Sequence, residues 1–231
     1  VDSELKKRTK ELEIEKIKTD ELLHNMFPSE IVKELKSKGA VSPKHYDSVS
    51  ILFTDFDNFT TFASKLSADK LVKDLNHIFT NFDFILDKHG LEKLKTIGDS
   101  YMIAGGLPNV TDDHAIKITR AAMEMQEIVH EVNDKHEFSC KMRVGIHTGP
   151  CVAGIVGIKK YTYDVWGDTV NIAKRLESNC EPGRINISRA TYDLVKDKFE
   201  CEYRGCIEAK GKGEIDMFFV KALKSATVNI S

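Results

Sequence analysis

Apolar and polar residues recur with distinct periods along the chain, and these periods predict its elements. In residues 1–27, Leu5, Leu12, Thr19 and Met26 stand seven apart among mostly charged neighbours. Thr9, Lys16 and Leu23 fill the intermediate positions, so the seam contains three polar residues. This imperfect heptad predicts a helix that forms a parallel two-stranded coiled coil. The alternative is a solvated helix that packs on its own domain. Because the pattern starts without an N-cap signal, we expect the chain to be a fragment of a longer protein.

Pro28 ends the heptad, and beyond it short apolar runs alternate with longer stretches of helical period. Gly98 separates two β-rich runs, where a residue without a Cβ permits a tight turn. Residues 148–150 are expected to form a second turn between two strands. The predicted elements are, in order, a helix over 29–36, a loop over 38–47, a strand over 48–54, a long helix ending at 89–90, a hairpin over 91–105, a helix over 112–136, strands over 141–147 and 152–156, a polar turn over 158–162, a helix over 168–178, and strands over 185–187, 199–203 and 215–220 with a helix over 188–196.

This order is βαββαβ followed by a smaller α/β extension. It predicts an α+β fold with a ferredoxin-like mixed sheet and helices on one face, preceded by an N-terminal helix. The domain organisation that follows is a coiled-coil or signalling helix over 1–27, a linker helix and loop over 28–47, a main domain over 48–222 and a tail over 223–231.

Composition narrows the class of protein. The 231 residues are 41% hydrophobic and 30% charged, which is enough apolar material for a core. A net charge of −2 gives no reason to expect nucleic acid or a membrane surface as partner, and the longest apolar run, 152–158, is too short to span a bilayer. The five cysteines are odd in number and lack CxxC spacing, which indicates reduced thiols and a cytoplasmic domain. Attachment of the parent protein to a membrane is left open.

Two aspartates offer metal chemistry. Asp55 follows a predicted strand and precedes a helix, so the backbone N–H groups of the loop Phe56, Asp57, Asn58, Phe59 and Thr60 can face an anion. Asp99, at the predicted hairpin tip, can share a cation with Asp55. Two carboxylates beside a polyphosphate suit Mg²⁺, and two metal ions about 3.5–4 Å apart can clamp an in-line displacement. Taken singly, an N-cap role for Asp55 and a turn role for Asp99 explain each position at least as well.

Two further pairs offer contacts to a nucleotide. Asn171 and Arg175 are four apart on a predicted helix, where an amide and a guanidinium can hold a ribose oxygen and a phosphate. A solvated helix face explains them equally well, and Asp168 is expected to cap the same helix. Lys210 and Lys212 alternate with glycines in a loop that can close over a triphosphate, or that is an ordinary surface turn.

Together these segments resemble the class III nucleotide cyclases, the adenylyl and guanylyl cyclase catalytic domain family, over residues 48–222. The motifs are individually modest, but their joint occurrence in this order is specific. Residues 21–28 resemble the helix that joins an upstream sensor to such domains. The matching stretches are 53–60 for the first metal and phosphate motif, 95–101 for the second metal motif, 143–150 and 153–157 for the core strand pair, and 164–175 and 210–213 for the remainder.

The resemblance implies roles by position. Asp55 and Asp99 would bind two Mg²⁺ or Mn²⁺ ions, and the loop over 56–60 would contact phosphate. The remaining roles are ribose orientation for Asn171, stabilisation of charge on the α-phosphate for Arg175, binding of the β- and γ-phosphates for Lys210, and base recognition for Lys95 and Asp164.

The last pair discriminates between bases. Lys95 only donates and Asp164 only accepts, which complements the N1 acceptor and N6 donor of adenine. Guanine reverses both positions, and unpaired buried groups discriminate strongly. Guanylyl members of the family typically carry glutamate and cysteine here. The expected activity is therefore that of an adenylyl cyclase, which converts ATP to 3′,5′-cyclic AMP and pyrophosphate. The alternatives are a guanylyl cyclase and an inactive dimer partner that binds nucleotide.

The family also builds each site from two subunits, one supplying the metal aspartates and the other the base and transition-state residues. This chain carries both sets, which implies a homodimer driven by a sensor missing from the fragment. Two positions depart from the family pattern. Asn58 replaces a usual glycine, and we expect it to tolerate the left-handed conformation. Pro150 stands where some members have a phosphate-contacting arginine, so Lys210 and Arg175 would carry more of that contact.

Overall fold

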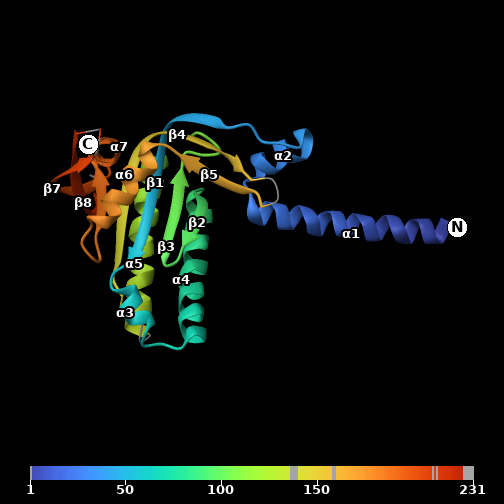
Figure 1. Ribbon diagram of the computed structural model, residues 1–231, viewed down its shortest axis with the longest axis horizontal. Coiled ribbons are helices and arrows are strands. Elements are labelled where there is room, and N and C mark those ends of the chain that lie inside the picture. The colour runs from blue at the N-terminus through green and yellow to red at the C-terminus, as the bar shows by residue number, and fades with distance from the viewer. Residues whose placement is uncertain (1, 136–139, 158–159, 210, 212, 226–231) are drawn as a thin grey trace, which may run out of the picture. The chain divides into compact units, whose positions relative to one another are not determined.

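The chain forms two compact units (Figure 1). One unit comprises residues 2–43 and 154–163, and the other comprises residues 44–153 and 164–225. The computed structural model describes residues 2–135, 140–157, 160–209, 211 and 213–225. The domain boundaries inferred from the sequence stay a prediction.

The first unit contains α1 (Asp2–Met26) and α2 (Ser29–Lys38), which confirms both predicted helices. Lys36 on α2 forms an ion pair with Asp20 on α1. Gly39, at φ 70°, ends α2 in the left-handed conformation, which a residue without a Cβ adopts at little cost. The assembly of α1 into a coiled coil stays a prediction.

The second unit is built on a mixed sheet, and its α+β class is the one predicted. The strands follow the order β2-β3-β1-β4-β6-β8-β7, and β5 pairs with β4. β1 pairs antiparallel with β3 and β4, whereas β4 pairs parallel with β6. The strands are β1 (Lys44–Phe56), β2 (Glu92–Ile97), β3 (Ser100–Gly105), β4 (Met142–Val156), β5 (Thr162–Trp166), β6 (Ile185–Ser188), β7 (Phe199–Ala209) and β8 (Gly213–Leu223).

Helices cover both faces of this sheet, which corrects the expectation of helices on one face. α4 and α5 run side by side in Figure 1, and their apolar side chains share a core with Leu52 and Phe56 of β1. On the opposite face, Lys174 of α6 lies over the ring of Phe53, 5.6 Å from its centroid. Successive strand residues point to opposite faces, so β1 separates these helices. The helices of this unit are α3 (Phe59–Ala63), α4 (Ala68–His89), α5 (His114–Lys135), α6 (Asp168–Ser178) and α7 (Arg189–Val195).

The predicted turn over 148–150 is wrong, because β4 runs without interruption from Met142 to Val156. Its partner β1 starts at Lys44, so residues 44–47 are strand rather than the predicted loop. The register between the two strands shifts between the pairs Tyr46–Cys151 and Val49–Gly149. Pro150 lies in that shift, where a missing N–H removes no bond from the ladder.

Glycines and a capping serine mark the ends of several elements. The hairpin over 91–105 is confirmed, with Gly98 at φ 63° in its turn and Gly90 at φ 62° ending α4. The prediction of one long helix before the hairpin is wrong, because α3 and α4 are separate helices. Ser67 caps α4 by accepting a hydrogen bond from the Lys70 N–H. The helix predicted over 112–136 is described as far as Lys135. Parts of the predicted turn over 158–162 and of the tail lie outside the described residues. All five cysteines are free thiols, as predicted.

Candidate active site

Two carboxylates meet at the end of β1. Asp55 is the second-last residue of that strand, not a residue after it as predicted. Asp99 lies in the turn between β2 and β3, and its Oδ2 accepts a hydrogen bond from the Phe56 N–H at 3.3 Å. Burial raises the pKa of Asp99, and the negative charge of Asp55 beside it raises that pKa further. The structure therefore brings the two predicted metal ligands together.

The donor set of this pair fits a divalent cation that keeps part of its own coordination shell. Within the described residues, no group of three or more His, Cys, Asp or Glu side chains is placed to hold a metal ion. The protein would thus supply the Asp55 and Asp99 carboxylates, and waters and substrate phosphates the remaining ligands. Mg²⁺ is usually bound in this way, through one or two carboxylates together with phosphate oxygens.

Fewer backbone N–H groups than predicted are available to an anion in the loop over 56–60. The Phe56 N–H is bonded to Asp99, and the Asp57 N–H donates to the Lys141 carbonyl at 2.9 Å. Asn58 has φ 55° and ψ 22°, the single non-glycine residue with positive φ in the described part of the chain. The expectation that asparagine tolerates this conformation is confirmed. The N–H groups of Asn58, Phe59 and Thr60 stay candidates for an anion.

An arginine that the sequence analysis did not single out contacts Asp55. Arg143 on β4 is the register partner of Asp55, and its Nη2 lies 2.5 Å from Asp55 Oδ2. Its Nε lies 3.5 Å from Oε1 of Glu177 on α6, a carboxylate with no exposed surface. Burial raises the pKa of Glu177, although Lys174, 2.6 Å from its Oε2, opposes that rise. The sequence alone indicates only which face of a strand Arg143 occupies, from the alternation of side chains along the strand. A glutamate near the end of a helix, such as Glu177, gives no sign in the sequence that it is buried.

Lys95 on β2 and Asp164 on β5 form an ion pair through Asp164 Oδ2. The two residues stand 69 apart in the sequence. The Val165 N–H donates to the other oxygen, Asp164 Oδ1, at 2.9 Å and fixes the carboxylate. A donor-only and an acceptor-only side chain therefore lie together, as the resemblance implied for the base-reading pair.

Asn171 and Arg175 share an exposed face of α6, as their spacing predicted. Arg175 Nη1 donates to the Glu208 carbonyl on β7 at 3.0 Å, two residues before Lys210. Lys210 and Lys212 lie outside the described residues. Asp168 is the first residue of α6 and Gly167 its N-cap, which corrects the capping role expected of Asp168. Among the described residues, no hydrogen bond or ion pair joins the three groups Asp55–Asp99, Lys95–Asp164 and Asn171–Arg175.

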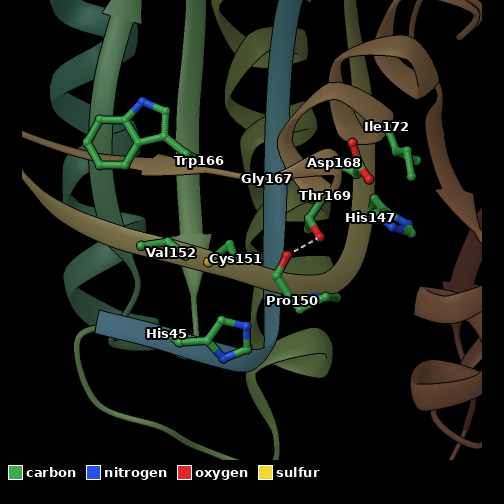
Figure 2. Close-up of a pocket in the computed structure, with 10 residues that line it drawn as sticks. All are labelled: His45, His147, Pro150, Cys151, Val152, Trp166, Gly167, Asp168, Thr169 and Ile172. Atoms are coloured by element: carbon green, nitrogen blue, oxygen red, sulfur yellow. Dashed lines mark hydrogen bonds between the residues drawn. The ribbon is translucent and has the colours of Figure 1, made fainter. Parts of the chain in front are cut away.

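A pocket of about 410 Å³ lies between β4 and the start of α6 (Figure 2). Thr169 Oγ1 donates to the Pro150 carbonyl at 2.6 Å and ties the two elements. His147 lines the pocket, and burial lowers its pKa to about 4. Ile172, which neighbours Asn171 on α6, lines it as well. The pocket was not predictable from the sequence, because it is lined by residues of β4 on either side of Pro150, where the sequence indicates a turn.

Residues 41–222 match the family model described as the adenylate and guanylate cyclase catalytic domain. The chain belongs to this family. It is a class III nucleotide cyclase domain, which confirms the resemblance drawn from the motifs.

Known cyclases of both substrate classes are similar to this cyclase domain. An adenylate cyclase of Mycobacterium tuberculosis is 38% identical over 217 residues, covering 93% of this chain and 49% of that protein. Human retinal guanylyl cyclase 1 is also 38% identical, over 222 residues, covering 94% of this chain and 20% of that protein. The chain thus spans half or less of these relatives, and sequence identity does not separate the two substrates.

A solved structure has the same fold. A non-canonical dimeric guanylyl cyclase domain of the RhoGC fusion protein from the aquatic fungus Blastocladiella emersonii superposes with a TM-score of 0.71 at 32% identity. The match covers 78% of this chain and 99% of that chain. None of the described helices of this cyclase domain is long and apolar enough to cross a membrane.

Proposed function

We propose that this cyclase domain is an adenylyl cyclase that converts ATP to 3′,5′-cyclic AMP and pyrophosphate. The observation that carries the proposal is the Lys95–Asp164 pair. Relatives of both substrate classes are equally identical to the chain, so the choice rests on the chemistry of these two side chains.

The pair complements adenine and opposes guanine. An ammonium donates to the N1 lone pair of adenine, and a carboxylate accepts from its N6 amino group. Guanine would place an N1–H and an O6 where these groups cannot both be satisfied. Buried polar groups left unpaired are unfavourable, so the site should reject guanine by several orders of magnitude. With no base bound, Lys95 and Asp164 satisfy each other, so neither side chain is left unpaired.

The remaining residues divide the chemistry. The ribose 3′-OH attacks the α-phosphate and pyrophosphate leaves. Asn171 orients the ribose, and Arg175 moves from the Glu208 carbonyl to the negative charge that develops on the α-phosphate. Asp55 and Asp99 would hold two divalent cations, which supply activation of the hydroxyl and stabilisation of charge. Lys210 would bind the β- and γ-phosphates.

The proposed enzyme is a homodimer with two equivalent sites. The chain carries both the metal-binding and the base-reading groups, and no hydrogen bond or ion pair joins them within one chain among the described residues. The similar fungal domain is described as a non-canonical dimer in one structure and as a monomer in another, so the homodimer rests on the groups of this chain rather than on that neighbour. Leu5, Leu12 and Met26 on α1 expose about two thirds of their surface, so a second α1 has apolar side chains to pack against. A sensor upstream of α1 would alter the distance between the half-sites.

A single assay tests the proposal. The purified chain with Mn²⁺ and either ATP or GTP should yield cyclic AMP at a rate far above that of cyclic GMP. Preference for GTP would favour the guanylyl cyclase alternative. No product from either nucleotide, together with nucleotide binding, would favour an inactive dimer partner.

A variant tests the metal assignment separately. Asp99→Ala should abolish turnover and leave the circular dichroism spectrum unchanged, and persisting turnover would refute the metal assignment.

A further inference from the structure

Arg143 lies between two carboxylates that belong to different elements. Its Nη2 is 2.5 Å from Asp55 Oδ2, and its Nε is 3.5 Å from Glu177 Oε1. Asp55 belongs to the acidic pair at the end of β1, whereas Glu177 belongs to α6 and is fully buried. The guanidinium has several donors, so it can favour one carboxylate or the other by a small movement.

The contact with Glu177 is incomplete. Arg143 Nε and Glu177 Oε1 are both buried, and neither has a hydrogen-bond partner among the residues that the structure describes. Buried polar atoms without a partner are costly, and the cost is higher when the groups are charged. The two atoms are partners for each other, and a closer approach of Arg143 to Glu177 would satisfy both.

Glu177 is held in place to receive that approach. Its other oxygen, Oε2, already bonds to Lys174 at 2.6 Å and to the Ser178 hydroxyl at 3.3 Å. Its backbone is fixed because α6 packs directly on Gly145 of β4. Glu177 Oε1 is therefore a fixed acceptor that points at Arg143, so a closer contact between the two requires a movement of Arg143.

We propose that Arg143 exchanges partners when a divalent cation binds, leaving Asp55 and closing onto Glu177. The inference rests on the proposed metal site at Asp55 and Asp99. Without a cation, Arg143 neutralises Asp55 and so limits the repulsion within the acidic pair. With a cation bound, Arg143 leaves Asp55 Oδ2, and its guanidinium moves to the buried carboxylate of Glu177. Arg143 acts through Asp55 and is a positioning residue that sets the affinity for the cation.

The exchange predicts that substitutions of Arg143 and of Glu177 change the affinity for Mn²⁺ in opposite directions. Arg143→Gln removes the competing charge, so Mn²⁺ should bind about tenfold more tightly, the effect of losing one charge in direct contact. Glu177→Gln removes the negative charge of the second partner, so Arg143 favours Asp55 and Mn²⁺ should bind more weakly by a similar factor. In the double variant the affinity should equal that of Arg143→Gln, because Glu177 acts only through Arg143.

The measurement is Mn²⁺ affinity of the full chain without nucleotide, from the electron paramagnetic resonance signal of free Mn²⁺. Arg189→Gln is the matched control, since Arg189 makes an arginine–aspartate ion pair with Asp216 at 3.1 Å on another part of the sheet, and its affinity should equal that of the wild type. Equal or weaker binding in Arg143→Gln, or unchanged binding in Glu177→Gln, would overturn the exchange. A wild type that binds no Mn²⁺ would overturn the proposed metal site as well.

A second measurement does not depend on variants that remove a buried charge. In the ¹⁵N-arginine spectrum of the wild type, the Nε–Hε signal of Arg143, assigned with Arg143→Lys, should move downfield on addition of Mg²⁺. That shift reports a new hydrogen bond from Nε to Glu177. A signal that stays in place at saturating Mg²⁺ would contradict the exchange even if both affinity variants failed to fold.

Discussion

Gly145 on β4 lies against the backbone of Glu177 on α6, so closely that a Cβ on Gly145 would stand 2.1 Å from the Glu177 nitrogen. The next nearest atom, the Ala173 carbonyl oxygen, would be 2.6 Å away. Both neighbours are helix backbone, which cannot rotate aside. Contact between this strand and this helix therefore requires glycine, and the burial of Glu177 depends on that contact.

Gly145→Ala should lower the free energy of unfolding by about 3 kcal/mol or more, because α6 must shift as a whole to admit the methyl group. Urea denaturation at pH 7 measures it. Gly39→Ala is the control. No described atom beyond its chain neighbours lies within 4 Å of its added Cβ, so only the left-handed backbone, at φ 70°, costs stability, about 1–2 kcal/mol. Equal losses in the two variants would contradict the close-packing argument.

Exchanging the base-reading pair should change the substrate. Lys95→Glu with Asp164→Cys places an acceptor and a weak donor where adenine needs the reverse, so the ratio of kcat/KM for ATP to that for GTP should fall at least about a hundredfold. Cyclic product quantified with each nucleotide measures the ratio. Lys117→Gln, which breaks the surface pair of Lys117 with Asp113, should leave the ratio unchanged. A double variant that still prefers ATP would show that other groups select the base.

Arg175→Lys should lower kcat by about 100-fold or more with little change in the KM for ATP, because a planar fork aimed at developing charge is replaced by a point charge. Arg189→Lys, on α7, is the matched control and should retain full activity. An increase in KM at constant kcat would instead place Arg175 in ground-state binding.

His147 should make the fold less stable in acid. Its pKa in the folded chain is about 4, below the value of 6.5 that applies when it is exposed, because burial disfavours the charged ring. The unfolded chain therefore binds the proton first, and the stability contributed by the neutral ring is present above pH 6.5 and lost between pH 6.5 and 4. The full loss is about 3 kcal/mol. Urea denaturation at pH 7.5 and pH 4.5 measures it. His147→Gln should flatten this part of the profile, and an equally steep profile in the variant would exclude His147 as its source.

The order of elements was predictable because most of them differ in period and end at glycines. Gly98 and Gly90 end their elements where the sequence indicates. The unbroken β4 was not predictable, because Gly149 and Pro150 are typical of turns, and only the register shift opposite Tyr46 and Val49 lets them lie in a strand.

The site divides in the same way. Asp55 and Asp99 could be proposed from their local settings, and the structure brings them together. The meeting of Lys95 with Asp164 is tertiary and was reached through resemblance. Arg143 and Glu177 were missed because an arginine on a strand and a glutamate on a helix look solvated until the packing at Gly145 is known.

The β2–β3 hairpin carries Lys95 on one arm and Asp99 at its turn. In the proposed homodimer these two residues serve different active centres, Lys95 the purine of one and Asp99 the cations of the other. A nucleotide that draws one hairpin inward thereby alters the metal-binding half of the neighbouring centre. The two active centres are therefore coupled through the hairpin, and a Hill coefficient for ATP that departs from one would report this coupling.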